Sequence, residues 1–298
     1  MKKSNFFIVF TSLFLILFTT GYLWIQPKAD PDKKEWKPLF NGKNLEGWDI
    51  KIAGHPLNEN YKNTFRFENG MVRISYDEYD RFNDKYGHMY YKEPFSHYIL
   101  RFEYRFTGKQ TPGGASWNVR NSGIMFHSQS AKSLTLGQEF PVSLEYQTLG
   151  GLDKGERHTG NLCTPGTIVH MDGKLNPNHC IDSDSKTYNG DGWVKGQILV
   201  LGDSLISHIV EGDTVLSYQQ PQIGEANWAQ GKEDAYSAIW KSKNGQALKE
   251  GYIALQAESH PIDFRNVELL NLKGCMNKNC PNYKSYYVVP GPCNCKKK

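Results

Sequence analysis

Three short stretches of the sequence place carboxylate, amide or imidazole side chains at alternate positions, between apolar residues. The polar members are His127 in "SGIMFHS", Glu145 and Gln147 in "VSLEYQTL", and Gln256 and Glu258 in "GYIALQAES". A carboxylate can remove a proton from carbon or bind a divalent metal, and a neighbouring amide or imidazole can stabilise the charge that develops. These side chains are therefore the first candidates for chemistry.

Strand geometry decides whether such side chains can meet, because alternate residues of a strand point to opposite faces. Each stretch predicts one apolar face and one polar face. If the three polar faces belong to one concave sheet, they form the floor of a cleft. The loop residues expected to flank that cleft are Trp117, Arg120, His158, Trp193 and His260. The same alternation occurs on any solvated sheet face, so a purely structural role stays open.

The elements that would position these residues are strands. "HYILRFEYRF" at His97–Phe106 alternates over ten residues, and Val194–Pro221 reads as consecutive strands broken at Gly202-Asp203 and again at Glu211–Asp213. Gly251–Leu272 reads as a closing pair of strands. Strand signals recur about every ten residues without interleaved amphipathic helices, which predicts an all-β antiparallel sandwich.

Long loops are expected at Gly108–Asn118 and Gln222–Ser237, of the kind that surround a binding face.

The N-terminus predicts export. Lys2 and Lys3 precede Phe6–Ile25, a segment without charge that is long enough to cross a bilayer. Residues 1–25 are therefore expected to be a signal peptide or a membrane anchor, and residues 26–35 a polar linker. The remainder would lie in the periplasm, on the cell surface or in the medium, with membrane contact only through the N-terminal segment.

All six cysteines lie in the second half of the chain, and an even number in an oxidising compartment predicts disulfides. Cys163 and Cys180 flank a long loop, and their pairing would stabilise the fold by about 3 kcal/mol. The other four form C-x4-C-x12-C-x-C, which fits two disulfides better than a zinc site because C-x-C is poor chelating geometry. They are Cys275, Cys280, Cys293 and Cys295.

Charge and motifs exclude several classes of function. The formal net charge of +4 includes two leader lysines and three terminal ones, so the body of the chain is nearly neutral and shows no nucleic-acid-binding stripe. The sequence has no Walker loop, G-x-S-x-G or H-E-x-x-H. Neither a nucleotide cofactor, a serine nucleophile nor a zincin centre is therefore expected.

Four segments in this order resemble the 3-keto-disaccharide hydrolase family of exported bacterial proteins. They are "LFNGKNLEGW" from Leu39, "NSGIMFH" from Asn121, "SLEYQTLGG" from Ser143 and "GYIALQAESHPIDFRNVEL" from Gly251. The resemblance covers residues 36–272, followed by a cysteine-rich basic tail at 273–298. It implies a concanavalin A-like jelly-roll sandwich of two antiparallel sheets. It also implies that the opening segment is a structural turn tying the N-terminal strand to the closing strand.

The resemblance further implies cleavage of 3-keto-glycosides, since a C3 ketone acidifies the C2 proton and allows β-elimination of the C1 oxygen, followed by hydration. Glu145 would be the base or a metal ligand, with Gln147 and His127 beside it, and a divalent metal on Glu145 and His127 is one hypothesis. The residues expected to contact the glycoside are Arg120, Gln256, Glu258, His158 and His260, with Trp117 and Trp193 stacking on sugar rings.

Two other functions remain open at this level. A conventional glycosidase needs two carboxyl groups at the scissile bond, and the stretch around Glu145 supplies only one. A non-catalytic carbohydrate-binding protein is the second alternative, since the same fold serves lectins.

Overall fold

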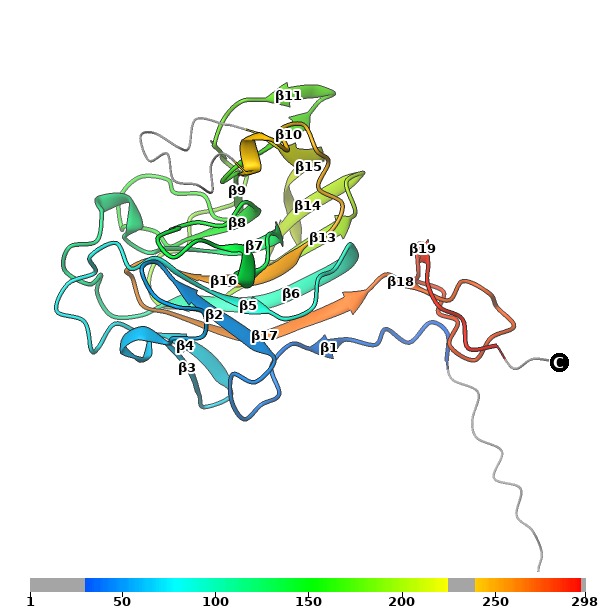
Figure 1. Cartoon of the computed structure of the whole chain (residues 1–298), viewed down its shortest axis with the longest axis horizontal. Coiled ribbons are helices and arrows are strands. Elements are labelled where there is room, and N and C mark those ends of the chain that lie inside the picture. Colours follow the sequence, from blue (N-terminus) through cyan, green and yellow to red (C-terminus); the bar gives the residue numbers. More distant parts are fainter. Residues whose placement is uncertain (1–29, 225–238, 296–298) are drawn as a thin grey trace, which may run out of the picture.

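The computed structural model describes residues 30–224 and 239–295. They form two large antiparallel sheets packed face to face (Figure 1). The prediction of an all-β jelly-roll sandwich is therefore confirmed. The ten-stranded sheet has the order β11 (Lys174–Asn176), β10 (Thr167–Met171), β15 (Asp213–Ile223), β14 (Leu205–Val210), β13 (Val194–Leu201), β6 (His97–Phe106), β17 (Ile262–Asn271), β4 (Met71–Ile74) and β3 (Phe65–Glu68), with β1 (Lys37–Pro38) also on β17.

The second sheet has seven strands. Its order is β12 (Cys180–Ile181), β9 (Asn161–Cys163), β8 (Leu144–Leu149), β7 (Asn121–Ser128), β16 (Tyr252–Ala257), β5 (Gly87–Tyr91) and β2 (Trp48–Ile52). Among the described residues, three 3₁₀ turns lie in the connections, at η1 (Tyr61–Asn63), η2 (Ser116–Asn118) and η3 (Ala131–Ser133). The expected loop at Gly108–Asn118 contains η2. Most of the expected loop at 222–237 lies outside the described residues.

The core fills the space between the sheets, as the two-residue period requires. In β6 the buried residues alternate with more exposed ones, and Phe102 packs edge-on against Tyr146 of β8 with ring centroids 5.2 Å apart. Leu144 and Tyr146 face this core. Glu145 and Gln147 consequently face away from it, on the outward face of the seven-stranded sheet.

The opening segment connects the two sheets, which confirms its predicted structural role. Gly42 has a φ of 75°, and the Asn41 side-chain oxygen accepts hydrogen bonds from the backbone N–H groups of residues 43 and 44. β1 before the turn pairs with the closing strand β17, and β2 after it joins the seven-stranded sheet. Trp48 stacks on Phe40 with centroids 4.5 Å apart and fixes the crossing.

All six cysteines are paired, as predicted, in the bonds Cys163–Cys180, Cys275–Cys293 and Cys280–Cys295. The last two bonds close a small extension with β18 (Lys273–Gly274) and β19 (Val289–Pro290), which lies apart from the sandwich at the right of Figure 1. Lys284 Nζ lies 2.5 Å from a Glu35 carboxylate oxygen, so the extension packs against the linker.

Across residues 30–224 and 239–295, no helix is long and apolar enough to span a membrane. The expected leader, Phe6–Ile25, lies outside these ranges.

A candidate active site on the seven-stranded sheet

A cavity of about 760 Å³ opens on the outward face of the seven-stranded sheet. Its polar residues include Asn121, Glu145, Gln147 and Glu258, and its apolar walls include Trp117 and Phe140. The structure thus brings together four residues that the sequence placed in a cleft: Glu145, Gln147, Glu258 and Trp117. Their individual roles remain predictions. Asn121 is an addition, and its side-chain oxygen is buried without a hydrogen-bond partner in the described part of the chain.

Strand register explains how Glu145 reaches the centre of the floor. Residues 125 and 123 of β7 pair with Glu145 and Gln147 of β8, so all four positions point outward. Gly123 leaves a gap there, and a β-carbon at this position would overlap the Glu145 carboxyl group. Glu145 therefore leans over Gly123 toward β16, the strand that leads to Glu258.

Burial controls the charge of this carboxyl pair. The Glu145 and Glu258 residues are 7% and 2% exposed. Oε2 of Glu258 is buried without a hydrogen-bond partner in the described part of the chain. Burial raises the pKa of Glu145 to about 8. Burial, followed by the charge of Glu145, raises the pKa of Glu258 well above its usual range, against the opposing effect of Arg157. The pair therefore retains a proton at neutral pH and titrates as a unit.

Gln256 shares this outward face. It follows Leu255, which pairs with Ile124, and so lies beside Gly123 and opposite His88 of β5. Gln256 is fully buried, and neither its amide oxygen nor its amide nitrogen has a hydrogen-bond partner among the described residues.

His127 is not part of this group, which corrects the sequence interpretation. It has a φ of 46°, and the pairing of β7 with β16 shifts register at this point. Such a bulge breaks strand alternation and reorients the side chain. The His127 ring instead bonds the Gly202 carbonyl oxygen at 3.0 Å, in the turn between β13 and β14 of the other sheet. Burial lowers its pKa to about 4.

Four expected flanking residues do not line the cavity. Trp193 packs against Arg105 and Arg265 of the ten-stranded sheet. The Cζ atoms of these arginines lie 4.7 and 3.9 Å from the centroid of the Trp193 ring. Its ring face is therefore covered by arginine rather than open to a sugar.

Arg120, His158 and His260 also have other neighbours. Arg120 bonds the Asp191 carboxylate at 3.0 Å and the carbonyl oxygen of residue 190. The His158 ring bonds the carbonyl oxygen of residue 185. His260 packs edge-on against Phe106, and burial followed by the charge of Arg120 lowers its pKa to about 4.

Sequence reasoning missed Arg157, which lines the cavity. No strand pattern covers the loop between β8 and β9, so the sequence does not indicate whether Arg157 or the adjacent His158 faces the site. Only the path of that loop places Arg157 at the cavity and turns His158 away.

The site does not fit the expected metal centre. Glu145 lines the outward cavity, whereas the His127 ring is buried and bonds the Gly202 carbonyl of the other sheet, so the two do not converge on one ion. Among the described residues, three or more His, Cys, Asp or Glu side chains converge only at the four tail cysteines, whose sulfur atoms are committed to disulfides. We therefore derive no step through a metal.

Residues 35–270 match the profile of the 3-keto-alpha-glucoside-1,2-lyase-like domain. The chain belongs to this family. The match confirms the resemblance seen in the four sequence segments. No curated protein matches the sequence.

Solved structures resemble the chain at low identity. A candidate glycosyl hydrolase from Parabacteroides distasonis ATCC 8503 is 17% identical, with a TM-score of 0.46 over 80% of this chain and 99% of that one. A second from the same organism is 18% identical, with a TM-score of 0.47 over 79% and 93%. A Bacillus subtilis protein of unknown function with a galectin-like fold is 11% identical, with a TM-score of 0.45 over 80% and 97%. These values carry no argument about function.

Proposed function

We propose that this protein is an exported enzyme that cleaves 3-keto-glycosides by proton abstraction at C2, β-elimination and hydration. The observation that carries the proposal is the buried pair Glu145 and Glu258 in one cavity, with the pKa of both carboxyl groups raised. Membership of the 3-keto-alpha-glucoside-1,2-lyase-like family supports a hydrolase-like activity on carbohydrate.

We assign the role of base to Glu145, which lies at the centre of the cavity floor. Burial raises the pKa of its carboxyl group to about 8, and in its ionised form it takes the C2 proton. The C2–H electron pair then moves toward the C3 ketone and gives an enolate. Glu258 can donate a proton to the glycosidic oxygen, since burial and the neighbouring Glu145 raise the pKa of its carboxyl group well above its usual range.

The remaining bonds follow from the enolate. Its electrons return, a C1=C2 double bond forms, and the C1–oxygen bond breaks. The leaving oxygen takes the Glu258 proton and departs as an alcohol. Water then adds across C1=C2, with hydroxyl on C1 and a proton on C2. The net reaction is hydrolysis, with no oxidant or reductant consumed.

The cavity walls suit a sugar substrate. Trp117 is 53% exposed and lies parallel to Tyr86, with an interplanar angle of 6° and centroids 6.1 Å apart. An aromatic face held in this way can pack against the C–H groups of a sugar ring. Asn121 and Gln147 supply amide groups for its hydroxyls, and the volume lies within the usual range for small-ligand sites.

The test compares 3-keto and unoxidised forms of the same disaccharide. We expect wild type to cleave only the 3-keto form and to exchange the C2 hydrogen with deuterated water. Glu145→Gln and Glu258→Gln should each lose at least about 100-fold in rate. Glu268→Gln is the matched control, because Glu268 bonds Arg101 on the other sheet. Normal turnover by both cavity variants would contradict the assignment.

A second candidate is a conventional glycosidase, which the structure favours more than the sequence did. Glu258 supplies the second carboxyl group that the stretch around Glu145 lacks. Cleavage of the unoxidised disaccharide, abolished by either substitution, would select this function. Binding without turnover of either sugar would instead select a carbohydrate-binding protein.

Export remains part of the proposal. Three disulfides in the described residues fit an oxidising compartment, and the charge-free Phe6–Ile25 supplies the expected signal or anchor. Fractionation of the producing cells, with mass analysis of the N-terminus, tests export and cleavage together.

A further inference from the structure

Arg157 is held rigidly at the edge of the cavity. Its Nη1 donates to the carbonyl oxygens of Val119 and Gly150, both at 2.7 Å, and of Arg120 at 3.3 Å. These carbonyls precede β7 and follow β8, the two strands that carry Asn121 and Glu145. The guanidinium group is therefore fixed relative to the carboxyl pair by the backbone itself.

The rest of the guanidinium group is uncommitted. Within the described residues, every side-chain hydrogen bond of Arg157 uses Nη1, which leaves Nε and Nη2 without a protein partner. Arg157 also forms no ion pair there, although six other arginines each pair with a carboxylate. Those six are Arg66, Arg73, Arg101, Arg105, Arg120 and Arg265.

The charge of the Arg157 guanidinium group matters for the reaction proposed in this cavity. Burial and the charge of Arg120 lower the pKa of Arg157, but a guanidinium group remains charged at any physiological pH. It lines the same cavity as Glu145 and Glu258. When Glu145 takes a proton from the substrate, negative charge leaves the protein and appears on a substrate oxygen.

We propose that Arg157 binds an anionic sp² oxygen, namely the C3 oxygen of the enolate. This inference rests on the proposed function. A donor fixed before the reaction stabilises developing charge without reorganising, and an ionic hydrogen bond from guanidinium is among the strongest available. Arg120, which the sequence analysis expected to contact the glycoside, is committed to Asp191.

A binding experiment tests the oxyanion site without turnover. The probe is kojic acid, a planar hydroxypyranone whose ionised form carries an enolate-type oxygen beside a ring ketone. It is titrated at a pH where it is ionised, with EDTA present so that chelated metal does not contribute. Its ring-hydroxyl methyl ether, which cannot ionise, is the matched ligand. We expect Arg157→Gln to bind kojic acid at least about 10-fold more weakly than wild type and to bind the ether equally.

Two further variants separate binding from folding. Arg157→Lys keeps the charge and should retain part of the preference for the anion, while Arg101→Gln, on the ten-stranded sheet, should behave as wild type. Thermal unfolding of each variant verifies that it is folded. Equal kojic acid binding by wild type and Arg157→Gln would overturn the inference, and so would an equal loss of anion and ether binding.

Kinetic measurements distinguish the role of Arg157 from the proposed cleavage of 3-keto-glycosides. On a 3-keto disaccharide, Arg157→Gln should lower kcat about 100-fold with little change in KM, as expected when a charge-stabilising donor is removed. If Glu145→Gln abolishes turnover but Arg157→Gln does not reduce it, only the role of Arg157 fails. If Glu145→Gln retains full turnover, the proposed function itself fails.

Discussion

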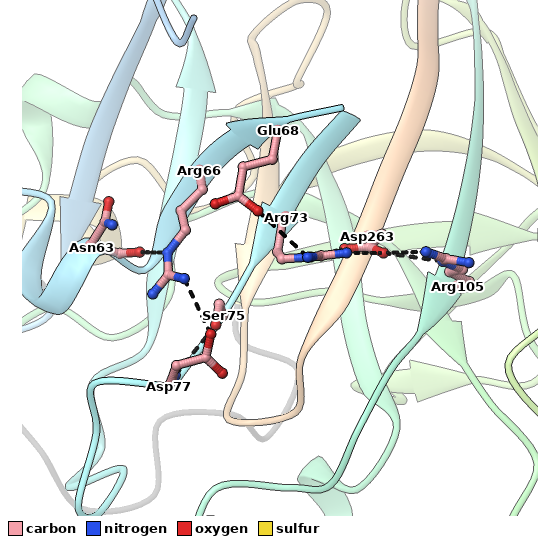
Figure 2. A network of polar contacts seen from close by, with 8 residues as sticks. All are labelled: Asn63, Arg66, Glu68, Arg73, Ser75, Asp77, Arg105 and Asp263. Carbon is pink, nitrogen blue, oxygen red and sulfur yellow. Dashed lines mark hydrogen bonds and ion pairs between the residues drawn. The ribbon is translucent and has the colours of Figure 1, made fainter. Parts of the chain in front are cut away.

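Asp263 and the Glu145–Glu258 pair are buried acids on the outward faces of the two sheets, and their surroundings differ sharply. Asp263 is fully enclosed between Arg73 of β4 and Arg105 of β6, as Figure 2 shows. Arg73 reaches its two oxygens at 2.9 and 3.2 Å, and Arg105 donates two bonds at 3.1 and 3.0 Å. Glu145 and Glu258 line one cavity, neither forms an ion pair with an arginine among the described residues, and Oε2 of Glu258 is buried there without a hydrogen-bond partner.

The difference separates a structural acid from a candidate reactive one. A buried carboxylate with two arginine partners is compensated, and it holds three neighbouring strands in register. Two buried carboxyl groups without such bonds retain protons, lower the stability of the fold when ionised, and can exchange protons with a ligand. The cavity on the seven-stranded sheet is therefore the place to look for chemistry.

The largest expected effect that depends on this contrast is on the pH profile of turnover. Because Glu145 must be ionised to act as a base and its pKa is raised to about 8, the rate should fall about tenfold per pH unit below 8. Initial rates on a 3-keto disaccharide between pH 5 and 9 measure this. A profile that is flat from pH 6 to 9, or that has its midpoint near 4.5, would contradict a buried base.

Replacing Asp263, the acid that arginines compensate, should change the stability of the fold rather than the rate of turnover. Asp263→Asn removes the carboxylate that Arg73 and Arg105 share and leaves Arg73 with Glu68 alone. We expect a loss of about 2 kcal/mol in the free energy of unfolding, since both arginines are partly exposed. Urea denaturation measures it, with Asp77→Asn as the exposed control. The folded variant should keep its pH profile. A change in that profile would mean that the two regions are coupled.

The smallest effect is a gain in stability at the cavity. The pKa of Glu145 is higher in the folded state than in the unfolded state. The contribution of its protonated form to the stability of the fold is therefore fully present below pH 4.5, and it is lost as pH rises through about 8. Glu145→Gln removes this loss. We expect the variant to be more stable than wild type at pH 8 and nearly equal to it at pH 4. A variant less stable at pH 8 would show that Glu145 is compensated after all.

Local pattern predicted much of the fold and part of the site. Alternation in "VSLEYQTL" placed Glu145 and Gln147 opposite Leu144 and Tyr146, and the structure has them so. The same rule failed at His127, because a single bulge reverses the face of a side chain and leaves no clear mark in "SGIMFHS".

The sequence by itself determined the all-β sandwich, the presence of disulfides and the polar faces of β8 and β16, because strand period, cysteine count and turn residues are local properties. Only the tertiary structure decided that Glu258 joins Glu145, that Arg157 rather than Arg120 or His158 lines their cavity, and that Trp193 lies on the other sheet. Those outcomes depend on strand register, loop path and burial, which arise from contacts between residues far apart in the chain.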